Sequence, residues 1–296
     1  MSHLTTRAPR RPHPAASGLP QALGDVDWGR LRIGVPGYAH PLVAPTEWAE
    51  LTRPGTPLDW VVLNVANGPG ARPDPHCLAA AGQLTNAGVR VIGHLDLAHG
   101  ARPFAELVAD AHHYLEWYRV GGFLLDRCPV ERPELAGVRR MTATLSSLLA
   151  GRGPGGSDGH LVLGHAGHPY PGYAEAADQL VTFSGAWTEY RWSQVAEWTA
   201  GYPPERFVHF VHGVPRTHLD EAVRIARWQG AGTIFFTDRP DRPAAGPGDL
   251  RNPADVADRE DREDREEPDR GRKVAFEALP GYWDEIVSRI GPGVSE

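Results

Sequence analysis

Eight short apolar segments recur along the chain, and most are followed by a longer stretch of mixed polarity. They are residues 31–36, 60–66, 89–97, 121–127, 160–166, 179–185, 206–213 and 233–239. Several are nearly continuous runs of aliphatic and aromatic residues, such as WVVLNV from residue 60 and FVHFVH from residue 207. Runs of this kind are typical of strands that are buried on both faces of a parallel sheet.

The stretches between these segments contain patterns of amphipathic helices. Helices are predicted over residues 104–118, 134–149, 218–229 and 276–290. In the first of these, apolar residues recur every three or four positions, at Phe104, Leu107, Val108, Ala111, Leu115 and Tyr118. Eight strands alternating with helices predict an α/β protein with a single (β/α)8 barrel. A doubly wound open sheet is the alternative, but no GxGxxG turn follows the first predicted strand.

Two segments are not expected to belong to the barrel, which we assign to residues 28–296. Residues 1–27 are rich in Pro, Arg and Ala and are predicted to form a flexible arm. Residues 240–272 are predicted to be a disordered, charged insertion after the eighth strand. Within it, residues 258–270 read DREDREDREEPDR, with eight acidic residues and four arginines. We interpret this run as a solvated insertion, with a partner-binding role as the alternative.

Composition excludes several classes of function. The net charge is -7 and the 30 Lys and Arg residues form no strong cluster, so a nucleic-acid partner is not expected. No apolar run reaches the roughly 18 residues that span a bilayer, so a membrane partner is not expected either. The first residues lack the apolar core of a signal peptide, which predicts a cytoplasmic protein. Cys77 and Cys128 are too few for a disulfide scaffold and are expected to be reduced and buried. The oligomeric state is left open.

In a (β/α)8 barrel the active site lies at the C-terminal ends of the strands. The polar residues expected there are Tyr38, His40, Asn64, Asn67, His94, Asp96, Asp126, Arg127, His165, His168, Ser184, His212 and Asp238. Asp96 and Asp126 end neighbouring strands, which lie about 5 Å apart in a sheet. Two flanking carboxyl groups are what cleavage of a glycosidic bond requires. Arg127 is expected to point to the opposite side of its strand from Asp126.

Metal and cofactor chemistry are not expected. His94, His165, His209, His212 and Asp238 are conceivable metal ligands, but the first strand has no HxH pair and no strand supplies a bridging lysine. No cofactor-binding motif is present. Aromatic residues near the predicted strand ends, among them Trp187, suit the apolar faces of sugar rings. Packing of helices against the barrel is the alternative role for the tryptophans.

Several motifs together resemble those of the spherulation-specific family 4, also called spherulin 4-like. They are VPGYAHP at 35–41, Trp48, LNVANGPG at 63–70, Asp74, AGVRVIGHLDLAHGAR at 87–102, WYRVGGFLLD at 117–126, ADQLVTFSG at 177–185, HGVP at 212–215 and LPGYWDE at 279–285. The resemblance implies a barrel related to glycoside hydrolase families 135 and 114. It also implies endo-acting enzymes that cleave polymers of α-1,4-linked galactosamine or N-acetylgalactosamine. Relatives of this kind are often secreted.

The resemblance also implies site residues. The family's aspartates after the third and fourth strands match Asp96 and Asp126. Three positions depart from the pattern: Arg127 replaces an acid or amide, Ser184 replaces a glutamate, and Gly164 replaces an asparagine that many relatives carry. A serine hydroxyl cannot replace a carboxylate in glycoside hydrolysis.

Two hypotheses follow from these departures. In the first, the protein is a metal-independent glycosidase that acts on an aminosugar polysaccharide. Its catalytic residues are then Asp126 with Asp96 or Glu189. Its substrate contacts are expected at Tyr38, His40, Asn64, Asn67, Arg127, His165, Ser184, Trp187, His212 and Asp238. In the second, the barrel is catalytically degenerate and only binds carbohydrate.

Overall fold

In the computed structural model, residues 31–37, 39–152, 158–165, 167–240 and 274–290 are described. Eight parallel strands form a closed barrel in which each strand pairs with its neighbours in sequence, and β8 pairs with β1. The strands are β1 (Arg32–Val35), β2 (Leu58–Leu63), β3 (Arg90–Asp96), β4 (Gly122–Cys128), β5 (His160–His165), β6 (Gln179–Ala186), β7 (Phe207–His212) and β8 (Thr233–Phe236). The predicted (β/α)8 barrel is therefore confirmed.

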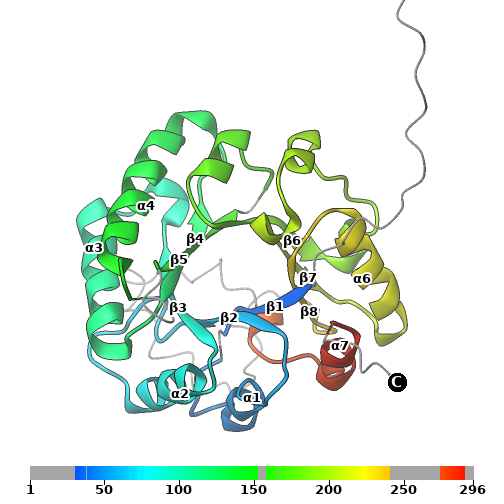
Figure 1. Ribbon diagram of the computed structural model, residues 1–296, viewed down its shortest axis with the longest axis horizontal. Helices are drawn as coiled ribbons and strands as arrows, with labels where there is room; N and C mark the ends of the chain where they lie inside the picture. The colour runs from blue at the N-terminus through cyan, green and yellow to red at the C-terminus, as the bar shows by residue number, and fades with distance from the viewer. Residues whose placement is uncertain (1–30, 38, 153–157, 166, 241–273, 291–296) are drawn as a thin grey trace, which may run out of the picture.

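Helices surround the ring of strands (Figure 1). They are α1 (Pro45–Glu50), α2 (Pro75–Asn86), α3 (Phe104–His113), α4 (Leu135–Leu149), α5 (Trp187–Tyr190), α6 (Leu219–Trp228) and α7 (Trp283–Ile290). The prediction of one helix over 104–118 is refined, because α3 passes into a π-helical turn, η2 (Tyr114–Tyr118). The prediction for 276–290 began too early, since Pro280 and Gly281 interrupt the chain before α7.

Trp60 occupies the interior of the barrel and is fully buried. Its indole N–H donates a hydrogen bond to Gln179 Oε1 at 2.7 Å, and its ring meets that of Phe210 edge to face with centroids 6.1 Å apart. A Cβ atom on Gly34 would lie 2.5 Å from the Trp60 ring, so the neighbouring strand must carry glycine here. The barrel is therefore filled by side chains, and only its ends are open to a ligand.

A segment near the C-terminus also contributes to the barrel interior. Phe276, in the short 3-10 helix η10 (Val274–Phe276), is 3% exposed. Its ring centroid lies 5.8 Å from that of Phe210, 6.0 Å from that of Phe235 and 6.0 Å from that of His212. Phe276 thus packs inside the barrel, against β7 and β8.

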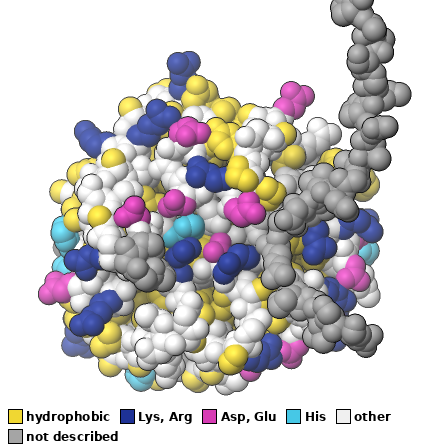
Figure 2. All heavy atoms as spheres, in the orientation of Figure 1, with side chains coloured by type: hydrophobic (Ala, Val, Ile, Leu, Met, Phe, Trp, Pro, Cys, Tyr) yellow, Lys and Arg dark blue, Asp and Glu magenta, His cyan; other side chains and the backbone are white. Residues whose placement is uncertain are grey.

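The outer surface carries interspersed charges. Basic and acidic side chains alternate over the face seen in Figure 2. None of the helices in the described part of the chain combines the length and the apolar character that crossing a membrane requires. Cys77 and Cys128 are both free and buried, as expected. The predicted arm (1–27) and nearly all of the predicted insertion (240–272) lie outside the described residues.

Candidate functional site

The inner face of β3 can be identified from its glycine. A Cβ atom on Gly93 would lie 2.8 Å from the Tyr114 ring, so Gly93 faces the helix layer. Because side chains alternate along a strand, His94 and Asp96 are on opposite sides from Gly93 and Leu95 and face the barrel interior. Asp96 stands directly opposite Asp126 in the register of β3 and β4. The structure therefore brings the two aspartates together as predicted.

Asp96 is held by several hydrogen bonds. The Arg127 guanidinium donates to both of its carboxylate oxygens, with Nε 2.8 Å from Oδ1. The backbone N–H of Ala98 donates to Oδ1 at 2.8 Å, and the side-chain amide of Asn67 donates to Oδ2 at 3.3 Å. Burial opposes ionisation of this carboxyl group, but these donors outweigh it and lower the pKa of Asp96.

Arg127 adopts a conformation that the strand pattern does not predict. Its φ is 48°, in the left-handed region, and the pairing of β4 with β5 is irregular between Leu125 and Cys128. Regular alternation therefore stops after Asp126, as it does at a β-bulge. The expectation that Arg127 simply points to the opposite side of a regular strand fails for this reason. Its guanidinium instead reaches across to Asp96 on the neighbouring strand.

Asp126 is the more accessible carboxylate, with 35% of its side chain exposed. The imidazole Nε2–H of His94 donates to its Oδ2 at 3.1 Å, and the backbone N–H of Arg127 donates to its Oδ1 at 2.8 Å. Burial acts to raise the pKa of Asp126, but the hydrogen bond and the electrostatic attraction from His94, together with the Arg127 N–H, lower it. Gly164 leaves space beside this group, because a Cβ there would lie 3.1 Å from Oδ1.

This arrangement has a chemical consequence. Both carboxyl groups have lowered pKa values and are therefore ionised at neutral pH. An ionised carboxylate can attack the sugar ring, activate water or stabilise an oxocarbenium ion. Protonation of the leaving oxygen requires a second group that holds a proton, typically a carboxylic acid with a raised pKa. Neither Asp96 nor Asp126 meets that requirement.

Other predicted residues lie near the same end of the barrel. Asn64 accepts a hydrogen bond from the Gly68 N–H at 3.3 Å, which shapes the loop that carries Asn67. The strand register places Ser184 beside Phe210 and pairs Ala186 with His212. Phe210 contacts Trp60 inside the barrel, so its register partner Ser184 also faces inward. His212 lies two residues after Phe210 and is therefore on the same inner face. Tyr38 lies outside the described residues.

The structure does not bring the remaining candidates to Asp126. His165 follows Gly164 in β5 and packs edge to face on Tyr173, in the outer layer. The Trp187 ring packs against Tyr190 and His218, also outside the barrel. Asp238 is exposed and accepts a hydrogen bond from the Gly281 N–H.

Glu189 lies in the short helix α5, directly after β6. It is exposed, and its Oε2 would lie 3.1 Å from a Cβ on Gly185. Among the described residues, no hydrogen bond or ion pair joins Glu189 to Asp96 or Asp126. Paired catalytic carboxyl groups stand about 5–9.5 Å apart, so direct contact is not required, and the role of Glu189 as the second catalytic acid stays a prediction.

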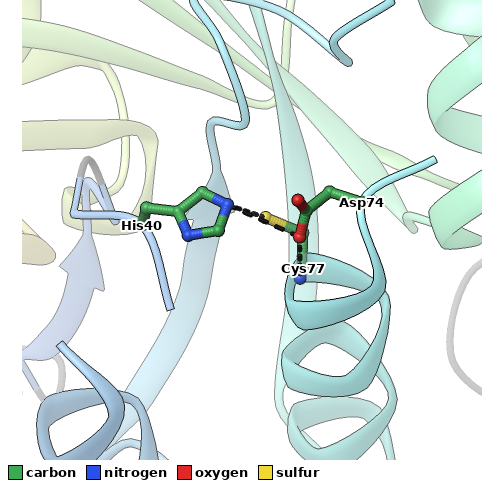
Figure 3. Close-up of side chains that lie close together, drawn as sticks. All are labelled: His40, Asp74 and Cys77. Carbon is green, nitrogen blue, oxygen red and sulfur yellow. Dashed lines mark hydrogen bonds and ion pairs between the residues drawn. The ribbon is translucent and has the colours of Figure 1, made fainter. Parts of the chain in front are cut away.

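His94 was expected at the active-site end of the barrel but was given no catalytic or substrate-binding role, although it contacts Asp126 directly. The signal for it was its spacing, because a residue two positions before Asp96 shares its face of the strand. His40 was expected to contact the substrate, and in the structure it lies beside Asp74 and Cys77. Its Nε2 lies 3.4 Å from Asp74 Oδ1 and 3.5 Å from Cys77 Sγ. These three residues form a potential metal-binding group (Figure 3).

Solved structures of other proteins are similar to this chain. Sph3 of Aspergillus clavatus, solved in complex with GalNAc, is similar to this chain with a TM-score of 0.67 and 22% identity, over 88% of this chain and 98% of Sph3. A chitinase from Rhizomucor miehei is similar with a TM-score of 0.45 and 12% identity, over 70% of this chain and 94% of the chitinase. The spore cortex-lytic enzyme SleL of Bacillus cereus is similar with a TM-score of 0.41 and 12% identity, over 62% and 50% of the two chains.

No curated protein matches the sequence. A family model does: that of the spherulation-specific family 4 matches residues 32–249. This range includes β1 to β8 and with them Asp96 and Asp126. Since the match covers more than half of the chain, the protein belongs to the spherulation-specific family 4.

Proposed function

We propose that this chain is a glycoside hydrolase-like protein that acts on an aminosugar polysaccharide of the α-1,4-linked galactosamine or N-acetylgalactosamine type. The observation that carries the proposal is the ionised, partly exposed carboxylate of Asp126 at the C-terminal end of the barrel. Membership of the family and the likeness of the fold to Sph3, which was solved with GalNAc, support the choice of sugar.

The proposed reaction uses carboxylate chemistry and no metal. Asp126 faces the anomeric carbon, and its negative charge stabilises the positive charge that develops on the sugar ring as the glycosidic bond breaks. The leaving oxygen takes its proton from water, and the hydroxide that remains bonds to the anomeric carbon. His94 and the Arg127 N–H keep Asp126 ionised and oriented. The same negative charge also suits a deacetylated unit, whose amino group is cationic.

A second candidate function is a barrel that binds the glycan without cleaving it. The ion pair between Asp96 and Arg127 favours this alternative, because it keeps Asp96 from serving as an acid. Ser184 favours it too, since it stands where the family carries a glutamate and supplies no carboxylate. Loss of one of two essential carboxylates commonly removes several kcal/mol of transition-state stabilisation.

One experiment separates these candidates. The purified protein is incubated with partly deacetylated α-1,4-galactosaminan, and both new reducing ends and retention on the polymer are measured. If the protein hydrolyses the polymer, Asp126→Asn should lower the rate by about 1000-fold or more, which is about 4 kcal/mol, with a nearly unchanged melting temperature. Full activity in that variant would remove Asp126 from the reaction.

Retention without new reducing ends would favour the binding protein. In that case Ser184→Glu tests whether the missing carboxylate is the cause, because it restores the family residue on the inner face of β6. A gain of hydrolysis in this variant would support loss of catalysis at that position. Absence of both retention and cleavage would overturn the proposed function.

A further inference from the structure

Three metal-ligating side chains meet at the rim of the barrel, outside the aspartate pair. His40 lies in the loop between β1 and α1, Asp74 is the N-cap residue of α2, and Cys77 lies in the first turn of that helix (Figure 3). We call these three residues the rim cluster. One ligand atom from each lies within 4.8 Å of the others. Cys77 is fully buried, and the side chains of His40 and Asp74 are each 28% exposed.

Two of the three distances between ligand atoms in the rim cluster match a tetrahedral zinc site. Zn–N and Zn–O bonds of about 2.0–2.1 Å and Zn–S bonds of about 2.3 Å place a tetrahedral N and S pair about 3.5 Å apart and an N and O pair about 3.4 Å apart. The observed separations are 3.5 Å for His40 Nε2 and Cys77 Sγ, and 3.4 Å for His40 Nε2 and Asp74 Oδ1. These two distances are therefore those of a zinc site, and binding requires the ring proton to leave His40 Nε2.

We propose that His40, Asp74 and Cys77 bind one zinc ion, with water in the fourth position. A thiolate, an imidazole and a carboxylate form a mixed ligand set that suits zinc better than the hard cations calcium or magnesium, which prefer oxygen ligands alone. A metal was not expected from the sequence, because the conceivable ligands were residues of the strands and strand ends and Cys77 was interpreted as a small buried residue. Folding joins Cys77 to a histidine from a different loop.

Zinc binding changes some of the existing hydrogen bonds of the rim cluster. The N–H groups of His76 and Cys77 both donate to Asp74 Oδ1 at 2.9 Å, which caps α2. Oδ1 has two lone pairs, so an ion that binds this oxygen takes the place of one of the two N–H groups, and the other continues to cap α2. The Leu42 N–H donates to His40 Nδ1 at 3.2 Å, which places the ring proton on Nε2. Zinc must move that proton to Nδ1, and the exposed Leu42 N–H must then bond to water instead.

The proposed ion would connect two loops next to the aspartate pair. His40 belongs to the loop after β1, whereas Asp74 ends the loop after β2. The latter loop also carries Asn67, which contacts Asp96. Zinc would therefore cross-link the two loops and hold them in place. It has no part in the reaction proposed for Asp126. The zinc proposal rests on the rim cluster alone and does not depend on the proposed glycan activity.

The test uses the full chain after treatment with a chelator. Cobalt(II) is added as a spectroscopic substitute, and zinc affinity is then measured by competition with a chromophoric chelator. We expect one ion per chain, a near-ultraviolet band of thiolate-to-cobalt charge transfer, and a melting temperature that rises with zinc concentration. Absence of the charge-transfer band in the unmodified protein would overturn the proposal.

Variants identify the ligands. Cys77→Ser should abolish the charge-transfer band, and Asp74→Asn should weaken zinc binding while keeping the helix cap, because Asn caps as well as Asp. His40→Gln should weaken binding by more than about 100-fold, since losing even an outer partner of a zinc ligand costs about 10–100-fold. Cys128→Ser and the surface variant His112→Gln are the controls and should bind normally. An unchanged band in Cys77→Ser, with folding verified by circular dichroism, would contradict the site even if glycan binding is found.

Discussion

At the scale of single residues, the two aspartates have different environments although they face each other. Asp96 is only 5% exposed and is enclosed by donors from Arg127, Ala98 and Asn67. Asp126 keeps an exposed edge and has His94 as its principal side-chain partner. This difference makes Asp126 the group that a ligand meets, whereas Asp96 serves to position Arg127 and the loop after β2.

A buried histidine predicts how stability depends on pH. Burial lowers the pKa of His165 to about 4, against a smaller opposing effect of the Cys128 and Pro129 carbonyls, and neither ring nitrogen has a hydrogen-bond partner among the described residues. The unfolded chain takes up this proton near pH 6.5, whereas the folded chain does so only near pH 4. The free energy of unfolding should therefore fall as the pH drops from about 6.5 to about 4.

The variant His165→Leu isolates this effect. As the pH falls, the free energy of unfolding should decrease by up to about 3 kcal/mol less in this variant, which is the energy that corresponds to the change in pKa. The measurement is urea unfolding at a series of pH values. The control is the exposed His112→Gln, which should leave the slope of unfolding free energy against pH unchanged. Burial lowers the pKa of His209 to about 3, so this residue should contribute to that slope in every variant. An unaltered slope in His165→Leu would show that this ring is not the sensor.

At the scale of elements, the strands were predictable because they are apolar on both faces, and their ends differ from the prediction by only a few residues. The local irregularities within the strands were not predictable. The irregular pairing of β4 that turns Arg127 toward Asp96 follows from a backbone conformation, and no residue pattern indicates it. The π-helical turn η2 could not be predicted either, because its apolar spacing is the same as that of an ordinary helix.

The end of η2 offers a test of backbone strain. Arg119 follows the turn with φ 54° and ψ 41°, a left-handed conformation that glycine adopts without steric cost. Arg119→Gly should therefore raise the free energy of unfolding by up to about 1 kcal/mol, as measured with urea. The matched control is Ala143→Gly in the interior of α4, where glycine should lower it by about 1 kcal/mol. Equal destabilisation by both would contradict the assigned conformation.

At the scale of the whole molecule, closure of the barrel brings together residues that are distant in sequence. Phe276 follows residues 241–273, and yet its ring completes the packing inside β7 and β8. From the sequence, Phe276 was predicted to begin a helix. Its burial indicates that the segment before α7 is an integral part of the fold.

Removal of the Phe276 ring should therefore destabilise the entire domain. Phe276→Ala should lower the free energy of unfolding by about 3–5 kcal/mol, since it leaves a cavity among aromatic rings. Urea unfolding followed by tryptophan fluorescence measures the change. Phe104→Ala is the comparison, because that ring is 37% exposed and its loss should matter much less. Similar losses in both variants would mean that Phe276 is not packed as described.

The sequence by itself determined the architecture, because continuous apolar strands and amphipathic helices can bury their surfaces together only in a few ways. It also determined that Asp96 and Asp126 are neighbours, since both end consecutive parallel strands. Tertiary structure alone decided the contacts of Arg127, the outward packing of His165 and Trp187, and the meeting of His40 with Cys77. These depend on local backbone dihedrals and on loops from different parts of the chain, which residue spacing does not encode.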